Sequence, residues 1–343
     1  MSEATTPRGS VTCGVVGLLV AAALVATACT SSAASGSGAS GARVRPSPGC
    51  AVRGAAGAVQ PVPAGGNRTV TLDTSTGGGT YSLWVPAGGG AGTPPGPAGR
   101  TVRPAPVILL FYGFASDPAA FTTLTGLPAR GAAAGSIVVV PHTQPGESEW
   151  QFDGSGSDAV FVSAVLTQVE DAYCVDEGKV FAAGFSAGAA FGITYACRHR
   201  DRIVAVATVA VEFVLGCTAP LGIVAFHGTA DPEVPYRDGA VGRSLPGVKV
   251  TGTQENMAGW ARLDGCRPGA TSTRLGSQVV RQVWHGCRPG TPVQLFTVLG
   301  GGHTWPGADP RSGVGLTTQQ VDATGAILAF FGVGTGTVGG NRN

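Results

Sequence analysis

Short, continuous apolar runs alternate with longer stretches of helical composition over most of the chain beyond residue 105. Such runs, when they end in turn residues, predict strands buried on both faces, as in a parallel sheet. The strands expected on this basis are 107–112, 136–141, 179–183, 203–209, 222–226 and 293–298. The expected helices are 119–127, 158–172, 187–198, 254–263 and 317–331. The pattern indicates an α/β protein with a mostly parallel central sheet and helices on both faces.

A different pattern precedes these runs. Residues 68–73 and 80–85 alternate apolar and polar side chains around a glycine-rich turn. Alternation of this kind predicts half-buried antiparallel strands. We therefore expect an N-terminal antiparallel hairpin at one edge of the sheet.

The first 28 residues have the layout of a secretory signal peptide. Arg8 precedes an apolar stretch at 15–26, and Ala28 and Cys29 follow it. Cleavage before Cys29, with lipid on its thiol, resembles the processing of a bacterial lipoprotein. Plain secretion and a retained membrane helix are the alternatives, but the apolar stretch is shorter than the ~20 residues that span a bilayer. Lipidation and secretion both put the mature domain outside the cytoplasm.

The next segment, residues 29–49, holds almost no large apolar side chain. Such a segment cannot offset the entropy lost on ordering, so it predicts a disordered tether. We expect the folded domain at 50–335 and a flexible tail at 336–343.

Charge excludes one class of partner. Charged residues make up 12% of the chain, the net charge is +2, and no face carries a cluster of Lys or Arg. Binding to a phosphate backbone needs such a cluster, so nucleic acid is not an expected partner. An uncharged substrate fits better, and membrane contact is expected only through the N-terminal lipid.

The cysteine count agrees with export. Of eight cysteines, Cys13 falls in the signal and Cys29 is assigned to lipid. The remaining set is even, as expected where disulfides persist. No CxxC pair or His-Cys cluster occurs, so a metal site is not expected. Cys266 and Cys287 flank a predicted hairpin, which favours a bond between them, and chain order alone suggests the other two. The expected disulfides are Cys266–Cys287, Cys197–Cys217 and Cys50–Cys174.

A candidate nucleophile lies in the segment Gly184-Phe185-Ser186-Ala187-Gly188, which matches the G-x-S-x-G pattern. The match alone is weak in a chain with 56 glycines. Its context strengthens it, because the pattern requires a strand before the serine and a helix after it, and both are predicted here. Ser186 is therefore the expected nucleophile, and an incidental serine in a glycine-rich turn is the alternative.

A serine hydroxyl needs a base to take its proton. His303 follows the last predicted strand in Gly300-Gly301-Gly302-His303 and is the expected base. His227, at the end of strand 222–226, is the one serious rival.

Asp231 lies between the nucleophile and the base in chain order, in the turn after strand 222–226. A carboxylate there can accept the Nδ1–H of His303 and hold its tautomer. An Asp that starts a turn before a proline is the structural alternative. Glu233 and Asp238 are the fallback acids.

Acyl transfer also needs hydrogen-bond donors for an oxyanion. The backbone N–H of Ala187, directly after the nucleophile, is one candidate. The loop after strand 107–112 supplies the other, and we assign it to the N–H of Phe114. A purely structural turn is an equal alternative for this loop.

The segments GFSAG, HGTADPEVPY and GGGHTWPG, in this order, resemble the esterase family that includes poly(3-hydroxybutyrate) depolymerases and family 1 carbohydrate esterases, such as feruloyl and acetylxylan esterases. The resemblance extends from about residue 68 to residue 331. It implies the α/β-hydrolase fold, a triad of Ser186, Asp231 and His303, and an acyl-enzyme formed without metal or organic cofactor. Exported lipoproteins of this type are also known.

One position departs from the family pattern. Tyr112-Gly113 stands where the family usually has His-Gly, so the second oxyanion donor is assigned less firmly than the triad. Trp305, two residues after the base, and Tyr112 are candidate walls of the substrate pocket. Packing of the Trp305 ring against the end of the sheet is the alternative.

The leading hypothesis is an extracytoplasmic serine ester hydrolase. Its expected substrates are small or oligomeric esters, of a hydroxyalkanoate or of a carbohydrate or phenolic acid, because no Thr/Ser-rich linker or binding domain follows residue 331. A peptidase or thioesterase on the same scaffold is one alternative, since fold and triad do not fix the leaving group. A non-catalytic binding lipoprotein of the cell envelope is the other.

Overall fold

The computed structural model describes residues 44–51, 65–74, 78–87, 103–143, 147, 149–214, 216–242 and 248–334. These residues belong to a compact unit that comprises Ala42–Asn343. The predicted signal peptide, residues 29–43 of the predicted tether and the predicted tail at 336–343 lie outside the described residues.

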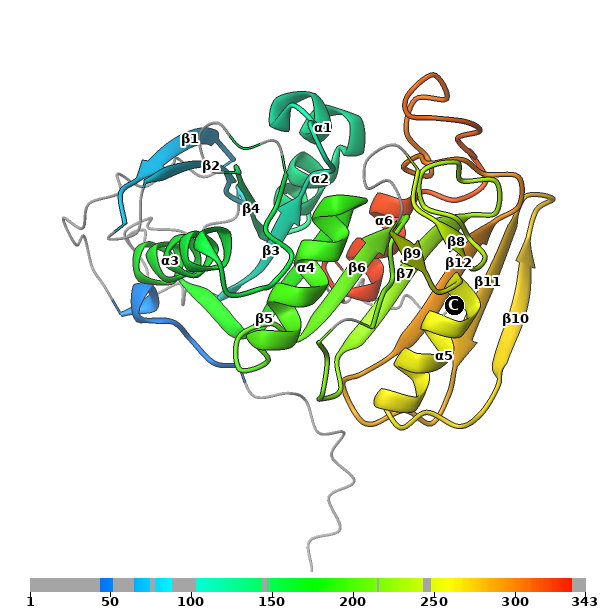
Figure 1. Ribbon diagram of the computed structural model, residues 1–343. Coiled ribbons are helices and arrows are strands. Elements are labelled where there is room, and N and C mark those ends of the chain that lie inside the picture. The colour runs from blue at the N-terminus through cyan, green and yellow to red at the C-terminus, as the bar shows by residue number, and fades with distance from the viewer. Residues whose placement is uncertain are drawn as a thin grey trace, which may run out of the picture. The chain divides into compact units, whose positions relative to one another are not determined.

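Within the described residues, ten strands form one sheet in the order β1-β2-β4-β3-β5-β6-β7-β12-β11-β10 (Figure 1). In chain order they are β1 (Asn67–Leu72), β2 (Gly79–Trp84), β3 (Ala105–Phe111), β4 (Ile137–Pro141), β5 (Val175–Phe185), β6 (Ala205–Val209), β7 (Gly222–Gly228), β10 (Ala270–Leu275), β11 (Val279–Trp284) and β12 (Val293–Val298). Two short strands, β8 (Gly239–Ala240) and β9 (Lys249–Val250), pair with each other.

The centre of the sheet is parallel, from β4 through β3, β5, β6 and β7 to β12. Every residue of β4, β6 and β7 is buried, which is the pattern that continuous apolar runs predict. The hairpin β1–β2 lies antiparallel at one edge and β10–β11 at the other. All six predicted parallel strands, the N-terminal hairpin and the hairpin between Cys266 and Cys287 are confirmed.

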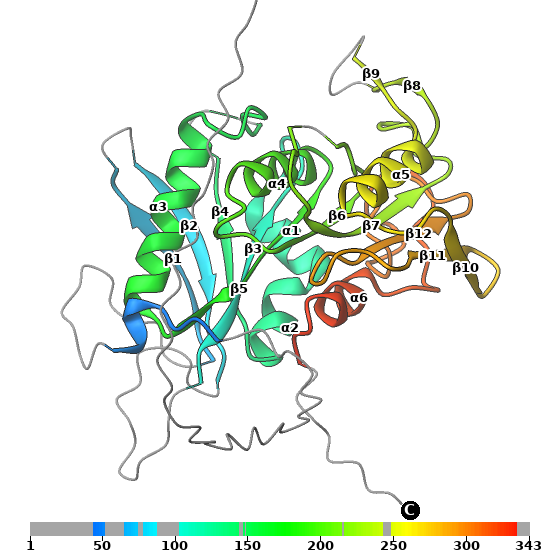
Figure 2. The same cartoon turned by 90° about the horizontal axis from the view of Figure 1, so that it is seen from below.

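Helices cover both faces of the sheet. Figure 2 shows α3 (Ser157–Ala172), α4 (Ala187–Arg198) and α5 (Thr253–Leu263) on one face, and α2 (Leu127–Ala133) and α6 (Ala323–Phe330) on the other. A further helix, α1 (Pro118–Thr125), precedes α2. No helix in the described part of the chain is both long and apolar enough to cross a membrane.

Two predicted helices need correction. The single helix expected at 119–127 is two helices, because Gly126 adopts a left-handed conformation (φ 59°) and a proline starts each helix within its first two residues. The helix expected at 317–331 begins only at Ala323, after Asp322 as its N-cap. The threonines before it are held in a loop, where the Thr318 hydroxyl donates to Gln278 Oε1.

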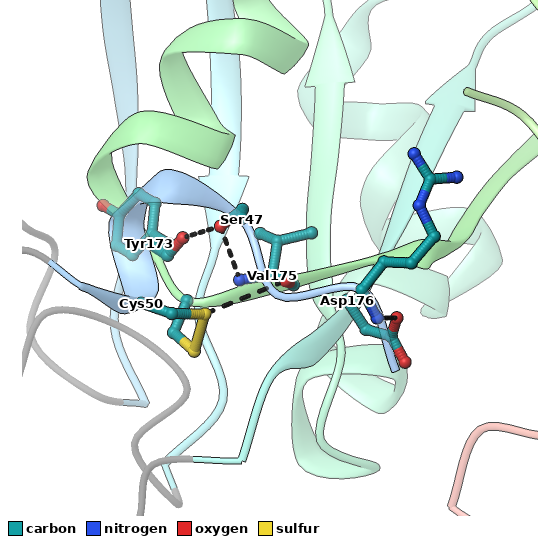
Figure 3. The surroundings of a disulfide bond; sticks show 7 residues. Ser47, Cys50, Tyr173, Val175 and Asp176 are labelled. Atoms are coloured by element: carbon teal, nitrogen blue, oxygen red, sulfur yellow. Dashed lines mark hydrogen bonds between the residues drawn. A yellow bond between two sulfur atoms is a disulfide. The ribbon is translucent and has the colours of Figure 1, made fainter. Parts of the chain in front are cut away.

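The chain already joins the domain before Cys50, so residues 44–49 do not form the free tether that was expected. Pro46 pairs with Asp176 in an isolated β-bridge, and the Arg45 N–H donates to Asp176 Oδ1 at 3.0 Å. The Ser47 hydroxyl donates to the Tyr173 carbonyl and accepts from the Val175 N–H, at 2.9 and 3.1 Å, as Figure 3 shows. Polar contacts of one short segment therefore replace the apolar anchors that the sequence lacks.

Three disulfides stabilise the domain, and their pairings are those predicted. Cys50–Cys174 ties the N-terminal segment to the start of β5, beside the contacts of Ser47 (Figure 3). The other two bonds are Cys197–Cys217 and Cys266–Cys287. Disulfides of this number fit a protein of an oxidising, extracellular compartment.

Candidate active site

Ser186 occupies a sharp turn between β5 and α4, which end and begin directly beside it. Its backbone angles are φ 53° and ψ −124°, a conformation that a residue with a side chain rarely adopts. The Ser186 N–H donates to the Val209 carbonyl of the neighbouring strand at 2.9 Å, which holds the turn. Strain of this kind persists only where the surroundings enforce it, and it is common at functional sites.

The glycines on either side of Ser186 make the turn possible. A Cβ atom on Gly184 would lie 2.5 Å from the carbonyl oxygen of Gly188. One on Gly188 would lie 2.3 and 2.4 Å from the carbonyl oxygens of Tyr112 and Phe111. The helix can therefore approach both its own strand and β3 only because these two positions lack a side chain.

Asp231 and His303 meet at the carboxyl ends of β7 and β12, which are adjacent and parallel. His303 Nδ1 lies 2.8 Å from Asp231 Oδ2, and both residues are buried. The other oxygen, Asp231 Oδ1, accepts the N–H groups of Glu233 and Val234 at 2.8 and 2.9 Å. Asp231 thus both forms the turn before Pro232 and contacts His303, so the two interpretations of this residue are compatible.

The backbone fixes His303 in turn. Its N–H donates to the Val314 carbonyl at 2.8 Å and its carbonyl accepts from the Val314 N–H at 3.2 Å. The imidazole ring stands 4.8 Å, centroid to centroid, from the ring of Phe185, the residue before Ser186. No hydrogen bond joins Ser186 and His303, both of which are described. Catalytic hydrogen bonds of this kind are often long without substrate and tighten when it binds.

The two expected oxyanion donors flank the nucleophile. Gly113 is so close to the turn at Ser186 that a Cβ on it would lie 3.4 Å from the Ser186 Cβ. Phe114 and Ala187 both line the cavity that Ser186 lines. In the described part of the chain, neither of their backbone N–H groups donates to a protein acceptor. No described group thus competes with a ligand oxygen for either N–H.

An apolar cavity of about 210 Å³ adjoins Ser186. Three phenyl rings, those of Phe114, Phe152 and Phe213, contribute to its wall. Four valines add to it: Val211, Val234, Val241 and Val248. Among the described residues that line it, Glu149 is the one that carries a charge. The cavity suits an uncharged, apolar group attached to the reacting carbon.

Comparison with known proteins agrees with this geometry. No protein-family model matches the chain. It is 30% identical over 190 residues to feruloyl esterase D of Neurospora crassa and 32% identical over 184 residues to feruloyl esterase C of Emericella nidulans. These alignments cover 54% and 52% of this chain, and 59% and 60% of the relatives. The chain thus spans about 60% of the length of these curated relatives.

A solved structure shows the fold. The acetyl xylan esterase from Aspergillus awamori superimposes with a TM-score of 0.55 at 14% identity, over 78% of this chain and 99% of that chain. The chain has the α/β-hydrolase fold and is similar in sequence to feruloyl esterases. The predicted resemblance to family 1 carbohydrate esterases is thereby confirmed. The lipoprotein type stays a prediction, since Cys29 lies outside the described residues.

Two residues suggested as pocket walls of this α/β-hydrolase do not line the cavity beside Ser186. Tyr112 is buried, and its hydroxyl donates to Thr143 Oγ1 and accepts from the Thr143 N–H, at 3.2 and 2.7 Å. Trp305 is also buried, with its indole N–H donated to Thr324 Oγ1 at 3.1 Å. Both aromatic rings pack in the core, edge-on against Phe121. The packing interpretation therefore holds for Trp305, and Tyr112 is a core residue as well.

The contacts of His227, the rival base, do not suit a proton acceptor for Ser186. Its Nδ1 lies 2.8 Å from Glu212 Oε2 and its Nε2 lies 2.9 Å from the Val234 carbonyl oxygen. Both ring nitrogens are thus engaged within the protein, in a side chain that is 1% exposed. The fallback acid Asp238 is also engaged elsewhere, since its Oδ1 accepts the Gly252 N–H at 2.7 Å.

Sequence reasoning missed Glu212. It follows β6 in the apolar run of residues 203–214 and is 1% exposed. A single acid in an apolar run was the only signal, and it does not indicate which partner the acid has.

Proposed function

We propose that this α/β-hydrolase is a serine carboxylic ester hydrolase that acts through an acyl-enzyme. The observation that carries the proposal is the 2.8 Å hydrogen bond between Asp231 and His303. It lies at the carboxyl ends of the parallel strands, where Ser186 forms its strained turn. Nucleophile, orienting acid and base follow β5, β7 and β12, in the chain order that this fold uses.

The first half of the reaction forms the acyl-enzyme. Ser186 Oγ attacks the ester carbonyl carbon while His303 Nε2 takes its proton. The carbonyl oxygen becomes an oxyanion, which the N–H groups of Ala187 and Phe114 stabilise. Collapse of this intermediate breaks the bond to the alcohol oxygen, which leaves with the proton held by His303.

The second half releases the acid. Water attacks the acyl carbon, His303 takes a proton from it, and a second oxyanion forms in the same place. Collapse returns the proton to Ser186 Oγ and frees the carboxylic acid. Asp231 keeps the Nδ1–H tautomer of His303 and stabilises the imidazolium in both halves.

The substrate class that the cavity favours is an ester of an aromatic or other apolar acid. Two relatives are named feruloyl esterases, and three phenyl side chains flank the cavity beside Ser186. Offset or edge-on packing of such rings suits a phenolic acyl group. We therefore propose phenolic esters of carbohydrates, as small molecules or oligomers, before hydroxyalkanoate esters.

A substrate panel tests the function. Methyl ferulate, nitrophenyl acetate, hydroxybutyrate oligomers, a peptide amide and an acyl thioester should be compared at equal enzyme concentration. The proposal expects turnover of esters above amide and thioester, with methyl ferulate as the best substrate, and labelling of Ser186 by a fluorophosphonate probe. Absence of labelling and turnover would favour a non-catalytic binding protein.

The cellular location is part of the same proposal. The three disulfides support an extracytoplasmic domain, and the sequence before Cys29 supports lipidation there. Metabolic labelling with palmitate should mark the wild-type chain but not Cys29→Ser. Unlabelled wild-type protein in the culture medium would show plain secretion instead.

A further inference from the structure

A second acid–imidazole pair lies directly behind the first. The side chains of Glu212 and His227 are each 1% exposed, and His227 Nδ1 is 2.8 Å from Glu212 Oε2. Neither residue has a part in the acyl transfer described above. A buried ionisable pair is costly to desolvate, so its presence beside a triad calls for a role.

The hydrogen bonds of His227 define its protonation. A backbone carbonyl can only accept, so the Nε2 that faces the Val234 oxygen at 2.9 Å must carry a proton. Nδ1 faces a carboxylate oxygen, and a bare lone pair there would repel it. A proton therefore lies between Nδ1 and Glu212. Burial by itself lowers the pKa of His227, but the charge and hydrogen bond of Glu212, with the Val234 and Asp231 interactions, raise it overall.

His227 also reaches the catalytic acid. Its Nε2 lies 3.6 Å from Asp231 Oδ2, the same oxygen that accepts the hydrogen bond of His303. Four side chains thus alternate as acid, imidazole, acid and imidazole, from Glu212 through His227 and Asp231 to His303. A second link between His227 and Asp231 runs through Val234. Its carbonyl accepts from His227 Nε2, and its N–H donates to Asp231 Oδ1.

The other described groups that face this pair are neutral. From α5, Thr253 Oγ1 lies 2.9 Å from His227 Nδ1 and Asn256 Nδ2 donates to Glu212 Oε1 at 3.4 Å. Tyr236, on the Asp231 loop, stands edge-on to the imidazole at 5.6 Å between ring centroids. Within the part of the chain that the structure describes, Glu212 on one side and Asp231 on the other balance the charge on His227.

We propose, on the basis of the esterase function above, that Glu212 and His227 are positioning residues of the triad. Glu212 holds His227 as an imidazolium, and this cation stabilises the ionised carboxylate of Asp231 and anchors the loop that carries it. His227 Nε2 and His303 Nδ1 face the same oxygen, Asp231 Oδ2. The cation therefore also weakens the attraction between the Asp231 carboxylate and a protonated His303.

Glu212→Gln isolates the charge from the shape. The glutamine can donate its amide N–H to Nδ1 of a neutral His227, while Nε2–H still donates to Val234. Asp231 then loses the positive charge of His227 beside it, together with the more distant negative charge of Glu212. His303 should bind its proton more tightly, so the acid limb of kcat/KM should move to higher pH by ~0.5 unit. The plateau of kcat should fall less than ~10-fold and KM should change less than ~2-fold.

The matched control is Glu255→Gln. It makes the same chemical change on α5, one residue from Asn256, at an exposed position. The pH profiles of wild type and both variants should be measured with one nitrophenyl ester, and thermal unfolding should be recorded for each. The proposal expects a shifted acid limb for Glu212→Gln alone. A Glu212→Gln profile that superimposes on the other two would overturn it.

A measurement on the wild-type protein covers the case in which Glu212→Gln does not fold. In protein with ¹⁵N-labelled histidines, both ring nitrogens of His227 should carry protons at pH 7.5, and the His227→Gln spectrum identifies its signals among the five histidines. A neutral His227 in the wild type would refute the pair. This experiment needs no turnover. It therefore tests the protonation of His227 even if the protein hydrolyses no ester and the proposed function is wrong.

Discussion

Replacing Asp231 by Asn tests whether the triad works as a unit, and the structure predicts how the amide will lie. Asp231 Oδ1 accepts the N–H groups of Glu233 and Val234, which only an oxygen can do. The asparagine must therefore keep its carbonyl oxygen there and turn its NH₂ group toward His303 Nδ1. Nδ1 then has to accept, so the proton of His303 moves to Nε2, the atom that should receive the Ser186 proton.

The magnitude follows from this reversal of tautomer. In a triad whose geometry is retained, the same substitution lowers kcat by ~10⁴-fold, or about 5.5 kcal/mol of transition-state stabilisation. We expect a loss of this order in kcat and in the rate of fluorophosphonate labelling. KM should change much less, because the cavity beside Ser186 does not include the Asp231 side chain.

Steady-state hydrolysis of a nitrophenyl ester between pH 6 and 9 measures this loss, with near-ultraviolet circular dichroism as the check on folding. Glu233→Gln is the comparison variant, because Glu233 is the fallback acid and its backbone N–H donates to Asp231 Oδ1. A loss below tenfold for Asp231→Asn, with a far greater loss for Glu233→Gln, would make Glu233 the orienting acid and refute the assignment.

Three further predictions concern the scaffold. Gly188→Ala should cost ~1–3 kcal/mol or more in thermal unfolding and slow fluorophosphonate labelling, since its Cβ would press on the carbonyl of Tyr112; unchanged values would contradict the elbow geometry. Burial raises the pKa of Asp264 to about 7, so the native state holds a proton that the unfolded chain releases, and this contribution to stability is lost as the pH rises from about 4 to about 7. Asp264→Asn should flatten that part of the pH dependence of Tm, and parallel curves for variant and wild type would count against it. Cys50→Ser with Cys174→Ser should lower the free energy of unfolding by ~2–4 kcal/mol, measured with urea, because the bond closes a loop with a sequence separation of 124 residues; an unchanged urea midpoint would contradict this.

The centre of the fold could be predicted because strands buried on both faces are continuous apolar runs, whichever elements they pack against. β7 (Gly222–Gly228) is buried at every residue and its run of apolar letters reads as a strand without further context. The break between α1 and α2 had a mark as well, since Gly126 precedes Leu127 and Pro128. A proline at that place starts a helix rather than continuing one.

Other elements depend on contacts that no local pattern records. Residues 44–49 have the composition of a linker, yet Ser47 is held by the backbone of Tyr173 and Val175, more than a hundred residues away. The late start of α6 also has a long-range cause, because the Thr318 hydroxyl donates to the side chain of Gln278, in the turn between β10 and β11. Long-range hydrogen bonds of side chains compete with local propensity and cannot be predicted from composition.

The candidate site divides along the same line. The positions of Ser186, Asp231 and His303 at the ends of strands could be predicted, because the fold has a fixed chain order for its proposed triad. Glu212 could not, although it also follows a strand, because its role depends on which strands are neighbours. The sheet order β5-β6-β7-β12 puts the end of β6 between the nucleophile strand and the acid strand. The chain after β6 must therefore pass beside the triad, and an acid in that segment meets the imidazole at the end of β7. Strand order, rather than spacing along the chain, makes Glu212 the neighbour of His227.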